Sequence, residues 1–203
     1  LPSPSSLAHS PGNGPSAGFY KPAKGLKILC NLPPMTVHNA YTTVMVDFKM
    51  MQAIHNGGVV VPGDWVLGAR PNKWMEMRND FYMKYAPQIK EFYMVLPRYV
   101  ANYTDFNCGH MATHYTANKL KCDEIHMYGF DSIFAFDITS STDLYLPSDR
   151  DNMNTERLTR NWRPVWTNMF KEFKDTQFII HNRTTDTKLI KLSENVEVRK
   201  GVK

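Results

Sequence analysis

Short apolar runs alternate with longer amphipathic segments along this chain. Runs rich in branched and aromatic side chains occupy 25–31, 42–47, 124–128 and 177–182. Between the last two lies a longer segment, 156–175, whose apolar residues recur three and four positions apart, as on one face of a helix. Strands that alternate with helices predict an α/β fold with a mainly parallel sheet, because parallel neighbours need a crossover connection.

The other segments predict more elements of the same two kinds. Gly and Pro residues separate them and set their expected ends. We therefore expect a Rossmann-like sheet flanked by helices. The further expected helices are 48–58, 72–92 and 109–120, and the further expected strands are 58–63, 65–71, 91–97 and an edge strand near the C-terminus.

The size of the chain suits one domain. It has 203 residues, of which 42% are hydrophobic, enough to form a proper core. Residues 1–18 are dominated by Pro, Ser and Gly, so we expect an irregular N-terminal segment that holds a Gly-rich turn. Residues 19–203 are expected to form the single α/β domain.

The Gly-rich turn is "GNGPSAG" at 12–18. Its spacing misses the G-x-G-x-x-G dinucleotide fingerprint by one residue, and no Gly-Lys-Ser/Thr follows as in a P-loop. Glycines let backbone amides approach a phosphate closely, which favours a ligand-binding turn. The segment before Gly12 is a poor strand, which favours a plain surface loop, so the local sequence leaves both interpretations open.

Polar residues follow several of the expected strands. In open parallel sheets, ligands bind beyond the carboxyl ends of the strands. Near the start of the expected helix at 109–120, Asn107 is a suitable cap, and Gly109 allows a ligand or another chain segment to come close. The expected rim of a site consists of Asn31, Asp47, Pro97 and residues 129–131.

The charge of the chain is mildly basic. A formal net charge of +5 fits a phosphate-bearing ligand or an acidic partner and does not require nucleic acid. Arg150 lies in a loop before an expected helix, where an arginine can bind a phosphate through two hydrogen bonds. The alternative is that the arginines of this region form a solvated helix face.

Three cysteines without a C-x-x-C pair favour a reduced, cytoplasmic compartment over a disulfide framework. No apolar run approaches the roughly 18 residues of a membrane span, so none is expected. The histidines show no ligand spacing such as H-E-x-x-H, so no metal site is expected. The oligomeric state stays open, a homo-oligomer included.

Three stretches in order resemble a known family. They are "GNGPSAG", a strand that ends in "CN" at 30–31, and "NCGHMATHYTANKLKCDEIHMYGFD" at 107–131. This order resembles the bacterial sialyltransferases of glycosyltransferase family 42. It is also similar to the related Rossmann-like proteins that include archaeal 6-hydroxymethylpterin diphosphokinases. The sequence around 128–137 resembles phage-encoded members of this family, which would place the protein in a host cytoplasm.

The resemblance implies a nucleotide-binding domain without a tightly bound cofactor or metal. It implies a nucleotide-activated sugar as donor, and a glycan or another hydroxyl compound as acceptor. Within "GNGPSAG", Asn13 and Ser16 are implied to lie by the phosphate and the sugar. The full set of residues expected at the donor is Gly12, Asn13, Gly14, Ser16, Asn31, Cys108, Gly109, Tyr145 and Arg150.

The expected base is where the chain departs from the family. The sialyltransferases use a histidine beyond the G-x-D strand, and this chain has none between His126 and His181. An acidic residue would have to take its place. The expected catalytic residues are Asp131, Asp137 and Asp143, with Tyr145 assisting the departure of the phosphate.

Two other functions stay open at this point. A pterin-type diphosphokinase would need ATP and magnesium. A non-catalytic nucleotide- or partner-binding protein would have kept the cleft and lost the base, which agrees with the missing histidine.

Overall fold

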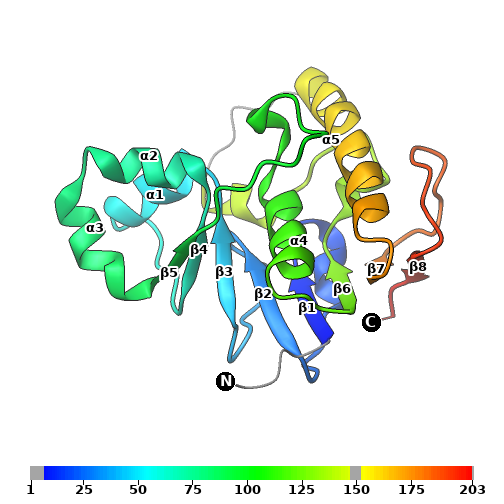
Figure 1. The fold of residues 1–203 in the computed structure, drawn as a ribbon, viewed down its shortest axis with the longest axis horizontal. Helices are drawn as coiled ribbons and strands as arrows, with labels where there is room; N and C mark the ends of the chain where they lie inside the picture. Colours follow the sequence, from blue (N-terminus) through cyan, green and yellow to red (C-terminus); the bar gives the residue numbers. More distant parts are fainter. Residues whose placement is uncertain (1–6, 147–151, 203) are drawn as a thin grey trace.

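A sheet of eight parallel strands runs through the middle of the molecule (Figure 1). The computed structural model describes residues 7–146 and 152–202. The strand order is β5-β4-β3-β2-β1-β6-β7-β8, so the first strand lies near the centre. The predicted α/β architecture is confirmed. The strands are β1 (Leu7–Pro11), β2 (Leu26–Cys30), β3 (Thr42–Met45), β4 (Trp65–Leu67), β5 (Ile89–Phe92), β6 (Glu124–Tyr128), β7 (Gln177–Asn182) and β8 (Val196–Lys200).

Helices cover both faces of the sheet. The side chains of each strand alternate between the faces, so Val44 packs in the core under α4 and α5, while Met45 packs under α1, α2 and α3. Figure 1 shows α4 lying across the central strands. The helices are α1 (Phe48–His55), α2 (Ala69–Glu76), α3 (Asn79–Tyr85), α4 (Cys108–Asn118) and α5 (Asn152–Glu172).

Strand β1 corrects the expectation of an irregular N-terminal segment. Leu7–Pro11 pairs with β2 on one side and with β6 on the other, so backbone hydrogen bonds hold a sequence that has few strand-forming residues. Ala8 and Ser10 are fully buried. Small side chains suit this position because α4 packs directly over β1. Long-range pairing has overridden the weak local propensity here.

The expected helix at 72–92 is wrong as a single element. The chain forms α2, then α3, then a short 3₁₀ turn at Ala86–Gln88 and strand β5. The break after Glu76 leaves Met77 86% exposed, although the spacing of Trp74, Met77 and Phe81 predicted one buried face. Trp74 and Phe81 still meet, with ring centroids 4.7 Å apart.

Three expected strands also differ. Residues 58–63 form no strand, β4 ends at Leu67, and β5 covers 89–92 rather than 91–97, so Pro97 does not end a strand. Gly68 precedes α2, and Pro71 lies in the first turn of that helix, where a proline needs no backbone donor. Within the described ranges, no helix is both long enough and apolar enough to cross a membrane.

Candidate functional site

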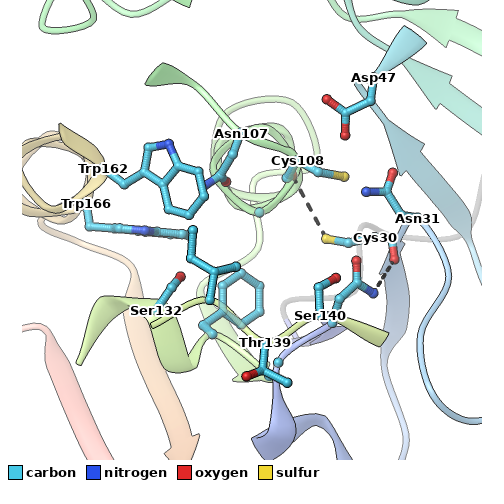
Figure 2. Close-up of a pocket in the computed structure, with 17 residues that line it drawn as sticks. Cys30, Asn31, Asp47, Asn107, Cys108, Ser132, Thr139, Ser140, Trp162 and Trp166 are labelled. Atoms are coloured by element: carbon cyan, nitrogen blue, oxygen red, sulfur yellow. Dashed lines mark hydrogen bonds between the residues drawn. The ribbon is translucent and has the colours of Figure 1, made fainter. Parts of the chain in front are cut away.

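A pocket lies at the carboxyl edge of the sheet, beyond the ends of β1 and β6 (Figure 2). The chain leaves β1 toward β2 on one side and, after β5, returns to the other side of β1 as β6. Such a reversal of strand order opens the crevice in which α/β proteins bind ligands. We call this space of about 140 Å³ the polar pocket. It is lined by residues 12–14, 30–31, 47, 107–109, 129–130, 132, 138–140, 162 and 166.

The walls of the polar pocket differ in chemistry. Figure 2 shows the indole rings of Trp162 and Trp166, from α5, on one side. Asn31, Asp47 and Cys30, which follow or end β2 and β3, lie on the other side. An aromatic wall opposite amide and carboxylate groups suits a ligand with one flat face and several polar atoms.

The Gly-rich turn after β1 is held by the backbone of β6. The amide of Gly12 donates to the carbonyl of Tyr128 at 2.6 Å, and that of Gly14 to the carbonyl of Gly129 at 2.8 Å. A Cβ at Gly14 would lie 2.5 Å from a carboxylate oxygen of Asp131. These two glycines therefore permit close packing of the turn on the β6 loop, and their amides do not point to a ligand.

Asn13 joins three segments around the pocket. Its Nδ2 donates to the carbonyl of Cys30 at 2.8 Å, and its Oδ1 accepts from the hydroxyl of Thr142 at 3.1 Å. The amide of Ser141 donates to the backbone oxygen of Asn13, and the Ser141 hydroxyl donates to the carbonyl of Leu32. The segment 138–142 is thereby fixed against the turns that follow β1 and β2.

Helix α4 begins at the pocket with a reciprocal cap. The side chain of Asn107 accepts from the amide of His110 at 2.9 Å, and Nδ1 of His110 accepts from the amide of Asn107 at 3.0 Å. The other ring nitrogen, Nε2, donates to the carbonyl of Trp162 at 3.2 Å. Burial lowers the pKa of His110 to about 3, so the ring is neutral and links the start of α4 to the tryptophan wall.

Two polar atoms of the pocket residues are buried without a partner. Among the described residues, Oδ1 of Asn31 and Nε1 of Trp162 have no hydrogen-bond partner. Asn31 is only 8% exposed and adopts φ 44°, a left-handed conformation that asparagine tolerates better than most residues. Because buried polar groups are nearly always paired, these two atoms are exceptions among the described residues that line the pocket.

One described carboxylate lines the pocket, and it is Asp47. Its Oδ1 lies 3.5 Å from Nη2 of Arg70, and its side chain is partly exposed. No described Lys, Arg or His lines the pocket. A negatively charged ligand group in the pocket would therefore bind to backbone amides. The amides of Cys108 and Gly109, at the start of α4, are available for this.

Asp131, expected as a catalytic residue, lies beneath the turn instead. Its carboxylate accepts from the amide of Ser16 at 2.9 Å and from the hydroxyl of Ser16 at 2.6 Å. Nε of Arg183 lies 3.3 Å from the same carboxylate. Asp131 is 5% exposed and does not line the polar pocket, so its contacts give it a structural role.

The other expected acidic residues also lie away from the pocket. Asp137 is exposed, beside Asp186 and Lys188. Asp143 lies in the 3₁₀ turn Ser141–Leu144 and does not line the pocket. Tyr145 is 63% exposed and faces a different pocket. Arg150 lies outside the described residues.

The structure brings together six of the residues expected at the donor. Ser16 is excluded from this group because it is buried against Asp131 and Asn182. Asp47, expected at the rim, is included, while Pro97 is not. The six donor residues that line the pocket are Gly12, Asn13, Gly14, Asn31, Cys108 and Gly109.

No sequence pattern predicted the aromatic wall. Trp162 and Trp166 are four residues apart in a helix, which is equally typical of core packing, and Trp166 is indeed 2% exposed. Phe130 belongs to the expected rim at 129–131 and does line the pocket. Its ring lies so close to Gly109 that a Cβ there would be 2.9 Å away, so this glycine allows α4 to approach β6.

The cysteines and the histidines add no metal or disulfide to the site. Cys30, Cys108 and Cys122 are all buried, and none forms a disulfide. The Cys108 thiol donates to the carbonyl of Val44 at 3.0 Å, and burial raises its pKa well above the usual range. In the part of the chain that the structure describes, no three His, Cys, Asp or Glu residues are placed to hold a metal ion.

Comparisons with family models, with curated proteins and with solved structures find no match for this chain.

Proposed function

We propose that the polar pocket binds a nucleotide-activated sugar and that the protein transfers this sugar to an acceptor hydroxyl. The observation that carries the proposal is the position of the pocket, at the reversal of strand order with α4 beginning in its wall. Nucleotides bind at this point in other open parallel sheets.

The start of α4 supports a phosphate site. The backbone amides of the first helical turn carry the positive end of the helix dipole, which favours an anion. Gly109 has no side chain that would cover them. In the proposed complex the diphosphate or monophosphate of the donor lies at Cys108 and Gly109, and Arg150 remains a predicted further contact.

The remaining walls support the nucleoside and the sugar. The indole of Trp162 offers a flat face and an unpaired Nε1–H, and Asn31 offers an unpaired Oδ1. A nucleoside supplies both an aromatic ring and the complementary acceptors and donors. Its binding would satisfy two groups that are otherwise buried without partners.

Asp47 replaces Asp131 as the proposed base. In the reaction, the oxygen of the acceptor hydroxyl bonds to the anomeric carbon, and the bond from that carbon to the phosphate oxygen breaks. The electron pair of that bond leaves with the phosphate, and the hydroxyl proton moves to the carboxylate of Asp47. The neighbouring Arg70 keeps this carboxylate oriented, at 3.5 Å.

A thermal-shift screen across nucleotides and nucleotide sugars tests the binding step. A ligand at 100 times its Kd should stabilise the protein by about 2.7 kcal/mol. We expect stabilisation by at least one nucleotide or nucleotide sugar; none across the whole screen overturns the proposal.

Replacing the carboxylate of Asp47 by an amide tests the transfer step. Asp47→Asn should still bind the donor but transfer the sugar about 100-fold more slowly or worse, since a positioned base typically contributes that much. Asp175→Asn is the matched control, because Asp175 is exposed and precedes β7 at the opposite edge of the sheet. Unchanged transfer in Asp47→Asn would remove Asp47 from the mechanism.

A binding protein without catalysis is the second candidate. This second candidate is favoured by the contacts of Asp131, because its carboxylate is engaged with Ser16 and Arg183. Asp47 is then the one described carboxylate that lines the pocket. Stabilisation by a nucleotide sugar with neither transfer nor hydrolysis would support it. Magnesium-dependent consumption of ATP would instead support a pterin-type diphosphokinase.

A further inference from the structure

A second, apolar pocket lies on the other face of the sheet, at the end of β2. Leu29 and Thr43 point to the face covered by α1, opposite to Cys30 in the polar pocket. We call this space of about 440 Å³ the apolar pocket. Its walls are the loop after β2, with Met35 and Ala40, and the irregular segment 58–62.

Most of the side chains that line the apolar pocket are apolar. Val59, Val60 and Val61 line it together with Pro33 and Pro62, and none of the described lining residues is charged. A ligand therefore gains by burying carbon atoms here and finds no partner for a charge. A charged group such as a phosphate does not suit such walls.

Two features connect the pockets. Asn31 lines both of them, and its buried Oδ1 has no partner in the described part of the chain. The segment after Ile138 also borders both, because residues 138–140 line the polar pocket and Tyr145 lines the apolar one. The two pockets thus share the turn at the end of β2, at Asn31.

From this arrangement we propose that the apolar pocket holds the hydrophobic part of the sugar acceptor, an aryl or alkyl group attached to the part of the molecule that carries the reacting hydroxyl. The inference rests on the proposed transfer and narrows its acceptor class. The hydroxyl donates to Oδ1 of Asn31 as it enters the polar pocket. There its oxygen displaces the phosphate oxygen from the anomeric carbon and its proton passes to Asp47, so that no further reactant is needed.

Phenyl β-D-glucoside and methyl β-D-glucoside are suitable probes, because they share the sugar and differ in the apolar group. Binding is measured by calorimetry on the full chain, without any donor. We expect the phenyl compound to bind about tenfold more tightly than the methyl compound. Equal binding of the two probes, or no binding of either, overturns the inference.

Two variants locate the binding. Val60→Asp places a charge in the pocket wall, and Val60 is 82% exposed, so the fold should tolerate it. Val202→Asp is the matched control, since Val202 is 74% exposed and lines no described pocket. Ala40→Phe fills the pocket without a charge. Both pocket variants should lose the preference for the phenyl compound, and the control should keep it; a preference that survives in both pocket variants overturns the inference.

The binding measurements use no donor, so they test the apolar pocket separately from the proposed transfer. Should phenyl binding respond to Val60→Asp while no nucleotide sugar is consumed, the transfer fails and the apolar site stands. Should transfer occur at equal rates to phenyl and methyl glucosides, the proposed function stands and the apolar site fails.

Discussion

Ser16 and Asp131 are 115 positions apart, and the serine gives both its amide and its hydroxyl to the carboxylate of the aspartate. The pair fastens the turn after β1 to the loop after β6, directly below the polar pocket. The Ser16 hydroxyl also accepts a hydrogen bond from the amide of Arg183, so the residue after β7 is held to the same turn. The shape of the pocket therefore depends on residues that do not touch its ligand.

Replacing Asp131 by alanine should destabilise the protein. The amide and the hydroxyl of Ser16 would be buried without their acceptor, which costs about 1–3 kcal/mol for each such group. For a chain of this size, about 1 kcal/mol lowers the melting temperature by roughly 2–4 °C. Thermal denaturation should show a loss of several degrees at pH 7, and an unchanged melting temperature would contradict the structural role of Asp131.

Gly14→Ala should disturb the same turn. Its Cβ would lie 2.5 Å from the Asp131 carboxylate and 2.8 Å from the carbonyl of Gly129, and neither neighbour can move freely. Forced overpacking of this kind costs about 1–3 kcal/mol. Gly18→Ala is the matched control because a Cβ there meets nothing within 4 Å. We expect a lower midpoint of urea unfolding in the first variant only, and equal midpoints would contradict the close packing.

The sequence predicted those parts of the fold that local patterns control. β2, β3, β6 and β7 are apolar runs with clear ends, and they lie where expected. β1 was missed because Ala8, His9 and Ser10 have little strand propensity and are held by neighbours on both sides. The expected helix at 72–92 is too long because the helical spacing of apolar residues continues across the break between α2 and α3. Tertiary packing determines the position of that break.

The candidate site was predicted where it depends on strand ends. Asn31 and Asp47 follow strands, and the rule for parallel sheets places them at one edge. Asp131 also follows a strand, but its side chain packs against Ser16 of the Gly-rich turn. No sequence pattern distinguishes a side chain that lines the pocket from one that packs against this turn. Trp162 comes from a distant helix, so its place in the wall depends on how α5 packs.

Acid should destabilise the folded protein through His110, which is buried, and His181, which is half-buried. Burial lowers the pKa of His110 to about 3, and burial together with His126 and Arg199 lowers that of His181 to about 4. An unfolded histidine has a pKa near 6.5. Between these values the unfolded chain binds a proton that the folded chain does not, so the free energy of unfolding falls as the pH falls, by about 1.4 kcal/mol per pH unit and proton.

Urea unfolding between pH 7.5 and pH 4.5 measures this dependence. His110→Gln removes one titrating group, so the fall in unfolding free energy below pH 6.5 should be shallower than in the unchanged protein. His38→Gln is the control substitution, because His38 is exposed. Equal slopes in the unchanged protein and in His110→Gln would mean that His110 binds protons alike in both states, which would contradict its lowered pKa.

Asn31→Gly should separate ligand binding from stability. At φ 44° glycine takes the left-handed conformation without strain, and the change removes a buried Oδ1 that has no partner in the described part of the chain. We therefore expect the unfolding free energy without ligand to change by less than about 1 kcal/mol, since a lost side chain and a removed unpaired acceptor offset each other. Any nucleotide or nucleotide sugar that stabilises the unchanged protein should bind the variant about tenfold more weakly, because a hydrogen bond in a buried site is worth roughly that factor. Calorimetric titration of both proteins measures the ratio, and equal affinities would mean that the amide of Asn31 faces no ligand.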